Sequence, residues 1–337
     1  MMRRKIAISL VSVFTCLWAA WSAPVPSLAQ GEVDPVEFRH KEIVRTVVDA
    51  IYTQGNVGVM DGFYTPTFTR HPSNSDLLTV KVSILALKAA IPDLRPSIPL
   101  IIADGNLVAF RLRLDGTLVN ELVFPNSVPI PATNQPITLL TNIVMRFDEN
   151  NLIAEEWDGF DNLGFLVQIG AIPPPQTEPV ELPLVFNIQP SPREQQNKEA
   201  TLAYYDGLSR NDFSVIDAYL RPDMSAYSVF GKMDRTAQNN DLSFLRNAMP
   251  DLSYTVDQVL AEANWTAVMY HVRGSFTQPY AASPDQPIQP TNQPFDLLVV
   301  TLYQFDEQGQ VVESYELFDS FSFLSQLGLN VPRVPGS

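Results

Sequence analysis

The 337-residue chain has a single cysteine, Cys16, and only three histidines. One cysteine cannot form an intramolecular disulfide, and so few cysteines and histidines do not supply the ligands of a zinc site. The sequence also has no glycine-rich phosphate loop and no serine in a nucleophile elbow. These features argue against disulfide scaffolds, zinc enzymes, P-loop nucleotide hydrolases and serine hydrolases, and we expect neither a metal nor a cofactor.

Basic residues are also scarce, with 22 lysines and arginines against 37 aspartates and glutamates, for a formal net charge of -15. Nucleic acids and anionic lipids are bound largely through lysine and arginine, so the acidic balance predicts no nucleic-acid partner. Solubility outside the cytoplasm is the simpler explanation of the acidity.

Three of those few basic residues, Arg3, Arg4 and Lys5, stand at the N-terminus. An apolar stretch at 6–21 follows them, and small residues up to and including Ala29 form a cleavage site. This is the pattern of a signal peptide. We therefore predict a signal peptide at 1–29, cleavage near Ala29 and export to the periplasm or the medium. About 16 apolar residues fall short of the roughly 20 that span a bilayer, so stable membrane insertion is not expected.

The remainder of the chain repeats itself. Residues 133–170 align without a gap on residues 291–328, with about two in five positions identical and a constant offset of 158 residues. This period is far longer than the roughly 20 to 50 residues of a solenoid repeat, so each copy is a whole domain. Seven prolines at 171–195 predict an extended linker between domains at 37–170 and 196–330.

Each copy has helical patterns first and strand patterns later. Apolar residues at helical spacing predict three helices in each copy, at 36–53, 57–64 and 78–91 in the first and at 198–209, 213–220 and 240–249 in the second. Alternating segments around Asp104-Gly105-Asn106 and 148–151 then predict an antiparallel meander, and a short helix at 163–169 closes the copy. The order predicts an α+β fold in which a curved antiparallel sheet wraps over three helices.

Several motifs in this order resemble the SnoaL-like polyketide cyclases of the NTF2-like superfamily. They are FTRHP at 68–72, IPDL at 91–94 and EEWDGFD at 155–161, with MPDL at 249–252 and ESYELFD at 313–319 in the second copy. The resemblance implies two tandem cone-shaped domains, each with a cavity for a small apolar or carbonyl-containing ligand. It also implies cofactor-free chemistry in which a carboxylate near the end of the last strand removes a proton alpha to a carbonyl.

The carboxylates that match this description are Asp158 and Asp161 in the first copy and Glu316 and Asp319 in the second. Such a base must be partly desolvated, so that its pKa rises toward the working pH. Asp161 and Asp319 also precede apolar helical runs, where aspartate is a favoured N-cap. Asp158 and Glu316 fit either a base or an exposed strand residue.

Other polar and aromatic residues near these motifs are candidates for binding or catalysis. His71 matches Tyr227 in the second copy, and either side chain could donate to a substrate carbonyl or simply be a half-buried polar residue at a helix exit. Trp157 matches Tyr315, as a cavity wall or as core packing. Arg111 projects from the opposite face of its strand to Phe110, toward either a ligand or solvent.

Two functions of different classes follow from the sequence. The first is an exported cyclase or isomerase. The second is a non-catalytic binding or assembly module in which the two copies form an internal pseudo-dimer. The copies differ at His71 and at Asp158, which favours the second, whereas the carboxylate retained at 158 and 316 fits either a base or an exposed strand residue.

Overall fold

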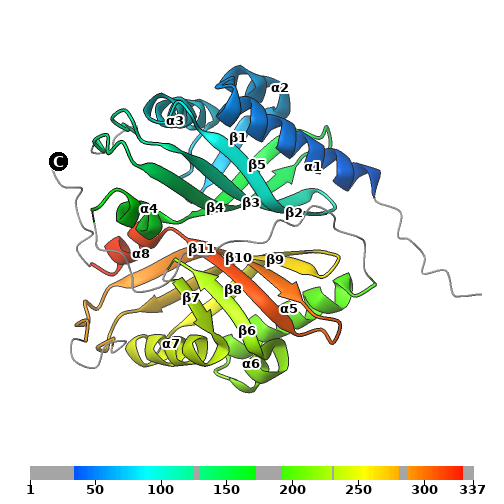
Figure 1. The fold of residues 1–337 in the computed structure, drawn as a ribbon. Helices are drawn as coiled ribbons and strands as arrows, with labels where there is room; N and C mark the ends of the chain where they lie inside the picture. Colours follow the sequence, from blue (N-terminus) through cyan, green and yellow to red (C-terminus); the bar gives the residue numbers. More distant parts are fainter. Residues whose placement is uncertain (1–33, 125–128, 172–191, 230, 281–286, 329–337) are drawn as a thin grey trace, which may run out of the picture.

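Two layered domains face each other through their sheets (Figure 1). The computed structural model describes residues 34–124, 129–171, 192–229, 231–280 and 287–328. The sheets lie at the centre and most helices cover their outer faces. The predicted signal peptide and most of the predicted linker lie outside the described residues. Within the described part of the chain, no helix combines the length and apolar character that crossing a bilayer requires.

In the first domain, helical segments precede the first strand, separate the first two strands and follow the last strand. Its helical segments are α1 (Pro35–Val48), a π-helical turn (Asp49–Thr53), a 3-10 turn (Val57–Val59), α2 (Met60–Phe63), α3 (Leu77–Ala90) and α4 (Asn162–Gln168). Its strands are β1 (Tyr64–His71), β2 (Arg95–Asp104), β3 (Leu107–Thr117), β4 (Pro136–Phe147) and β5 (Ile153–Phe160). They form one sheet in the order β1-β5-β4-β3-β2.

The second domain repeats this order with one added strand. Its helices are α5 (Glu194–Ser209), α6 (Ser214–Tyr219), α7 (Arg235–Ala248) and α8 (Ser320–Gln326). Its strands are β6 (Leu220–Ser228), β7 (Gly231–Asp234), β8 (Ser253–Glu262), β9 (Trp265–Ser275), β10 (Pro294–Phe305) and β11 (Val311–Phe318). The sheet order is β7-β6-β11-β10-β9-β8.

The predicted α+β class, with helices on a curved sheet in each of two copies, is confirmed. The sheets are mixed, however, because β1 runs parallel to β5 and β6 runs parallel to β11. The sequence pattern predicts the exit of a helix at 68–72 and does not reveal either parallel strand. Each strand contains polar residues and pairs with a strand about 90 residues later, so its local pattern carries little strand signal.

Side-chain caps fix the helix boundaries in both copies. Asp76 accepts a hydrogen bond from the backbone of α3, and Asp234 does the same for α7, at 2.8 Å in each case. Asp93 of the Pro-Asp-Leu motif accepts from Thr117 N, and Asp251 accepts from Ser275 N. The motif recurs because it ties the end of a helix to the sheet.

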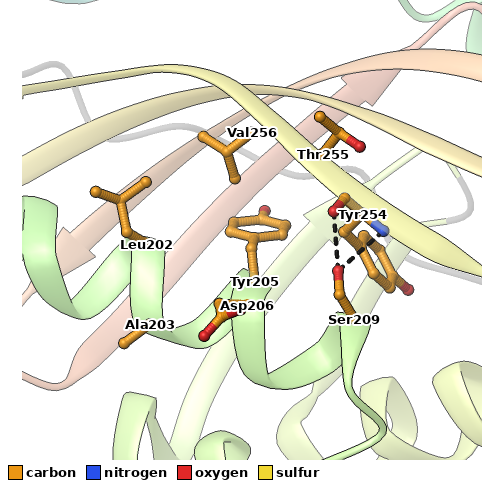
Figure 2. Close-up of a pocket in the computed structure, with 8 residues that line it drawn as sticks. All are labelled: Leu202, Ala203, Tyr205, Asp206, Ser209, Tyr254, Thr255 and Val256. Carbon is orange, nitrogen blue, oxygen red and sulfur yellow. Dashed lines mark hydrogen bonds between the residues drawn. The ribbon is translucent and has the colours of Figure 1, made fainter.

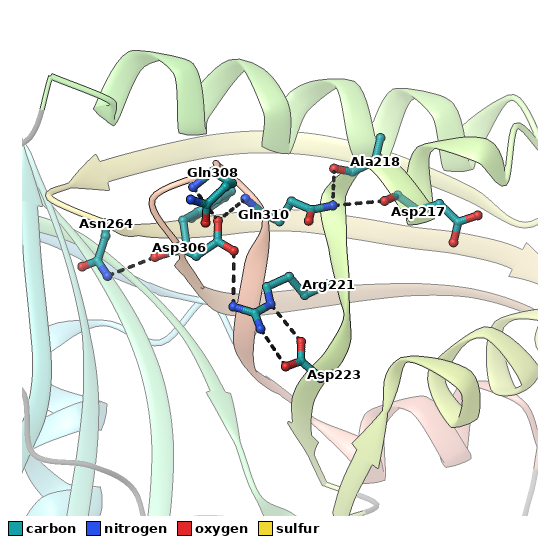
Figure 3. A network of polar contacts seen from close by, with 9 residues as sticks. Asp217, Ala218, Arg221, Asp223, Asn264, Asp306, Gln308 and Gln310 are labelled. Carbon is teal, nitrogen blue, oxygen red and sulfur yellow. Dashed lines mark hydrogen bonds and ion pairs between the residues drawn. The ribbon is translucent and has the colours of Figure 1, made fainter.

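The β10–β11 turn is tied to the neighbouring helix and strand by a polar network (Figure 3). Asp306 accepts from the backbone of Gln310, and the Gln310 side chain donates to the carbonyl groups of Asp217 and Ala218 at the end of α6. Arg221 at the start of β6 lies between Asp223 and Asp306. These contacts hold the start of β6 against the turn, which sets the register of the parallel pair.

Each domain has its own apolar core, and a third apolar cluster lies between the two sheets. It joins side chains that face away from the helices, from Leu100, Ile102, Ala109 and Val144 in the first domain to Leu260, Trp265, Ala267, Met269, Leu298, Val300, Leu302 and Tyr315 in the second. Both faces of each sheet are therefore buried over its centre. Asn142 is fully buried there, and its amide donates to the Val300 and Tyr315 carbonyls at 2.9 and 3.0 Å.

Equivalent residues of the two copies exchange matching contacts at the edge of this interface. Lys41 pairs with Glu262, and Lys198 pairs with Asp104, which is the counterpart of Glu262 at the 158-residue offset. Glu262 also accepts from Ala103 N at 2.7 Å, and Asp104 accepts from Ala261 N at 3.0 Å. These contacts therefore repeat when the two copies are interchanged.

Gly159 marks the point where the two backbones come closest. A Cβ atom at this position would lie 2.3 Å from the carbonyl oxygen of Leu317, its own counterpart in the second copy. Backbone cannot move aside as a flexible side chain can. We expect Gly159→Ala to lower the free energy of unfolding by about 1–3 kcal/mol, as other overpacking changes do.

Urea unfolding followed by circular dichroism would measure this effect. Gly62→Ala is the matched control, because a Cβ at Gly62 meets nothing within 4 Å. Gly62 lies in a helix, where alanine is the better residue, so the control should keep or slightly raise stability. Equal stabilities for the two variants would show that the domains do not pack as described.

Candidate functional site

The second domain holds a small cavity between its helices and the inner face of its sheet. The cavity has a volume of about 100 Å³. Its walls come from α5, β7, α7 and the four strands β8–β11, through Tyr204, Tyr205, Leu208, Met233, Gln238, Asn239, Asp241, Leu242, Leu245, Tyr254, Tyr270, Tyr303 and Glu316. This is the space of about three or four liquid water molecules, which suits a ligand of about five non-hydrogen atoms.

Glu316 brings a carboxylate to this cavity from β11. It lies opposite Thr301 on β10, on the face that carries the apolar core of the domain. The Tyr270 hydroxyl donates to Glu316 Oε2 at 2.9 Å. Burial raises the pKa of Glu316, and the charge of Asp241 adds to the rise, while the hydrogen bond from Tyr270 opposes it. Glu316 has no ion-pair partner among the residues that the structure describes.

A second carboxylate, Asp241 on α7, lines the same cavity. It accepts a hydrogen bond from the Tyr280 hydroxyl at 2.6 Å. Burial raises the pKa of Asp241 as well, against the lowering effect of that hydrogen bond. Two carboxylates in one confined space resist full ionisation, because each disfavours the charge of the other.

Tyrosines form most of the remaining wall. The hydroxyl groups of Tyr205 and Tyr303 lie 2.7 Å apart, and the Tyr205 and Tyr270 rings are 4.4 Å apart between centroids. Burial holds the pKa of each of these phenols well above its usual value. They are therefore neutral hydrogen-bond donors at any ordinary working pH.

An open groove lies on the other side of two of these tyrosines (Figure 2). The groove, of about 510 Å³, runs between α5 and β8 and is lined by Leu202, Ala203, Tyr205, Asp206, Ser209, Tyr254, Thr255 and Val256. Tyr205 and Tyr254 belong to both the groove and the cavity. Ser209 exchanges hydrogen bonds with the Tyr254 backbone, which anchors β8 to α5 at this point.

The matching region of the first domain is occupied by an arginine. Arg70 on β1 donates to both carboxylate oxygens of Asp158, at 3.1 and 2.7 Å, and lies 3.2 Å from Glu156. Burial raises the pKa of Glu156 to about 7, with Arg70 lowering it and Asp158 raising it. Asp158, the sequence-predicted base, is thus held in an ion triad.

The structure places Asp161 and Asp319 at helix N-termini. Asp161 accepts from Gly164 N at 2.8 Å, and Asp319 accepts from Phe321 N and Ser322 N at 3.0 Å. Asp319 also accepts from the Asn162 side chain of the first domain at 2.7 Å. Both residues therefore cap α4 and α8, and neither lines the cavity.

The aromatic candidates lie on the opposite face of the sheets. His71 stacks on Trp157, and Tyr227 stacks on Tyr315, at centroid distances of 5.1 and 5.0 Å. Trp157, Tyr227 and Tyr315 all contact the cluster between the two sheets. A strand alternates its side chains, so residues next to Asp158 and Glu316 in sequence necessarily face away from them.

Arg111 also belongs to the interface between the domains. Its guanidinium donates to Asn142 at 3.0 Å and lies 5.3 Å from the centre of the Tyr315 ring. Burial lowers the pKa of Arg111 to about 10. Of the nine sequence-predicted site residues, the structure brings only Glu316 to the cavity of the second domain.

The functional residues that sequence reasoning missed are Asp241 and the cavity tyrosines. One signal could have revealed them: nine of the chain's 11 tyrosines lie after residue 196. At the positions of Tyr270 and Tyr303 the first copy has Leu112 and Met145. Positions that hold apolar core residues in the first copy hold tyrosines in the second. This difference indicates that the second domain has the more polar interior.

Comparison with known proteins assigns the family. The chain matches the SnoaL-like polyketide cyclases over residues 42–169 and again over 198–327, and it belongs to that family. Each copy is a complete member, so the protein is a tandem SnoaL-like protein of the NTF2-like fold.

Solved structures similar to this chain include single-domain proteins. AclR from Streptomyces galilaeus is 24% identical and covers 40% of this chain and 97% of its own, with a TM-score of 0.36. TsrD from Streptomyces laurentii is 19% identical, with 42% and 100% covered and a TM-score of 0.36. A SnoaL-like polyketide cyclase from Agrobacterium tumefaciens strain C58 is 15% identical, with 39% and 98% covered and a TM-score of 0.33. A comparison with curated proteins gave no match.

The triad in the first domain predicts a pH-dependent effect on stability. Because the pKa of Glu156 is about 7 in the folded chain, above its usual 4.5, folding favours the protonated form. The stabilising contribution of protonated Glu156 is complete below pH 4.5 and is lost as the pH rises through 7. We expect Glu156→Gln, which mimics the protonated acid, to match the wild type at pH 4.5 and to exceed its stability at pH 8 by on the order of 1–3 kcal/mol.

Unfolding in urea at both pH values would measure this difference. Glu149→Gln, in an exposed turn of the same domain, controls for the loss of one negative charge. A Glu156→Gln variant that is less stable than the wild type at pH 8 would mean that the charged triad is net stabilising, contrary to the raised pKa.

Proposed function

We propose that the second domain binds a small carbonyl compound in its tyrosine-lined cavity and acts on it as a cofactor-free cyclase or isomerase. The observation that carries this proposal is Glu316, a half-buried carboxylate that faces the cavity with a phenol as its hydrogen-bond partner and with no cation beside it among the described residues. A base for a carbon acid needs this combination, since desolvation without a counter-ion raises its basicity.

The surrounding groups match the requirements of the reaction. Glu316 would take the proton alpha to the carbonyl, and the negative charge would move to the carbonyl oxygen. Tyr205 is hydrogen-bonded to both Tyr303 and Tyr270, so the carbonyl oxygen would take the place of one phenol partner and accept from the hydroxyl group released. A neutral donor placed where charge develops stabilises the enolate. The enolate would then be reprotonated at another atom, as in an isomerase. Ring closure on a second carbonyl, as in a cyclase, would need a longer ligand that extends out of the cavity.

The first domain has a different role in this proposal. Its carboxylates are neutralised by Arg70, so it would serve as the structural half of an internal pseudo-dimer. The reciprocal pairs Lys41 with Glu262 and Lys198 with Asp104 support this assignment. One chain would thereby supply the sheet-to-sheet contact without a second copy.

The decisive test is proton exchange at carbon. Hydroxyacetone, with five non-hydrogen atoms, fits the cavity, and its exchange into D₂O can be followed by NMR. We expect catalysed exchange by the wild type and a loss of at least about 100-fold in Glu316→Gln. Asp158→Asn, the equivalent change in the first domain, should keep the rate within about two-fold.

Equal rates in the wild type and Glu316→Gln would contradict the enzymatic proposal. The assembly function would then be the better account, because the interface contacts do not depend on Glu316. The raised pKa of Glu316 adds a second criterion. Since the base must be ionised, the rate should rise with pH through a midpoint above the usual glutamate range, and that limb should vanish in Glu316→Gln.

Export is part of the same proposal. The basic start at Arg3, the apolar stretch at 6–21 and the small residues before Ala29 support a cleaved signal peptide. We expect protein secreted by a bacterial host to begin at Gln30, which N-terminal sequencing or intact mass would establish. Full-length protein retained in the cytoplasm would contradict this.

A further inference from the structure

Beside its phenol and amide donors, the cavity has side-chain oxygens that act as acceptors. Asp241, Glu316 and the side-chain oxygen of Gln238 all line it, and the Gln238 oxygen is buried with no hydrogen-bond partner. The lining residues include no lysine, arginine or histidine. Arg246 lies outside the lining, 5.8 Å from the centre of the Tyr254 ring, and donates to the Leu252 and Leu208 carbonyls. A ligand that completes this site must therefore bring donors.

The first domain shows what occupies the equivalent space. Arg70 stands opposite Glu156 in the parallel pair of β1 and β5, and Ala226 stands opposite Ser314 in the pair of β6 and β11. Asp158 and Glu316 are likewise equivalent, because Asp158 pairs with Ile143 on β4 and Glu316 pairs with Thr301 on β10. The first copy thus has a cation, Arg70, beside Asp158. The second copy has the equivalent carboxylate, Glu316, but an alanine in place of the cation.

We propose that the ligand of the second domain carries an ammonium group, which takes the place of the missing Arg70 guanidinium. The substrate class is then a small amino ketone or related amino-carbonyl compound of about five non-hydrogen atoms. The carbonyl part of this assignment rests on the proposed function, whereas the ammonium part rests on the acceptors and on the comparison of the two copies.

The chemistry of the cavity matches a primary ammonium. Its N–H donors correspond to the Asp241 carboxylate and the unpartnered Gln238 oxygen. The aromatic rings of Tyr204, Tyr205 and Tyr254 in the lining add a favourable environment for a cation. Asp241 would hold the charge, which leaves Glu316 to act on the adjacent carbon.

Aminoacetone and hydroxyacetone are a matched pair of probes, since they differ only in the ammonium and the hydroxyl. Binding to the full chain would be measured by NMR titration at pH 6.5, where the amine is charged. We expect aminoacetone to bind at least about ten-fold more tightly than hydroxyacetone. Asp241→Asn should reduce that preference to within about two-fold, and Glu307→Gln, which removes one negative charge at an exposed turn, should leave it unchanged.

A second variant restores the internal cation. Ala226→Arg places a guanidinium where the first domain has Arg70, so it should abolish the preference for the amine, with near-UV circular dichroism to verify folding. Equal binding of the two probes, a preference that survives Asp241→Asn, or no binding of aminoacetone at tens of millimolar would each overturn the proposal.

The outcome is separable from that of the proposed function. An amine preference without Glu316-dependent exchange would remove the enzymatic role and keep the ammonium site. Glu316-dependent exchange that is equally fast for both probes would keep the enzyme and remove the ammonium site.

Discussion

The packing of one sheet on the other constrains the rest of the molecule. Because the outer face of each sheet is buried against its partner, both faces of the central strands need apolar or fully satisfied side chains. Asn142 meets this requirement by donating to two carbonyl groups of the other domain. Arg111 meets it only in part: it donates to Asn142 and lies over the Tyr315 ring, but its buried Nε atom has no hydrogen-bond partner among the described residues. Only the inner, helix-covered face remains available for a ligand.

The two inner faces satisfy the same constraint in different ways. The first domain pairs its two interior carboxylates with Arg70, while the rest of its interior is mainly aliphatic side chains and phenylalanines. The second domain buries tyrosines, whose hydroxyl groups bond to one another and to Glu316. Apolar side chains pack without regard to direction, whereas rings linked through their hydroxyl groups are held at fixed orientations, and the cavity lies between them.

The sequence predicted the elements better than it predicted the site. The capping roles of Asp161 and Asp319 depend on neighbouring residues, and the 158-residue offset is visible in the sequence itself, so both could be predicted directly. The strands β1 and β6 could not, because their hydrogen-bond partners lie far along the chain. The same limit applies to Trp157 and Asp158, which are neighbours in sequence but face the interface and the interior respectively. Whether an aromatic residue lines a cavity depends on which sheet face is covered, and that is a tertiary property.

The pattern of changes between the copies argues for a retained site in the second domain. Loss of Arg70 alone would have left two buried carboxylates without a counter-charge, which is strongly destabilising. The second copy has Ala226 in place of Arg70 and also Ser314 in place of Glu156, so one negative charge disappeared with the positive one. Glu316 nevertheless remained, and Tyr270 replaced an aliphatic residue to bond it. A buried acid kept without its cation costs stability, and selection for ligand binding or catalysis is what would retain it against that cost.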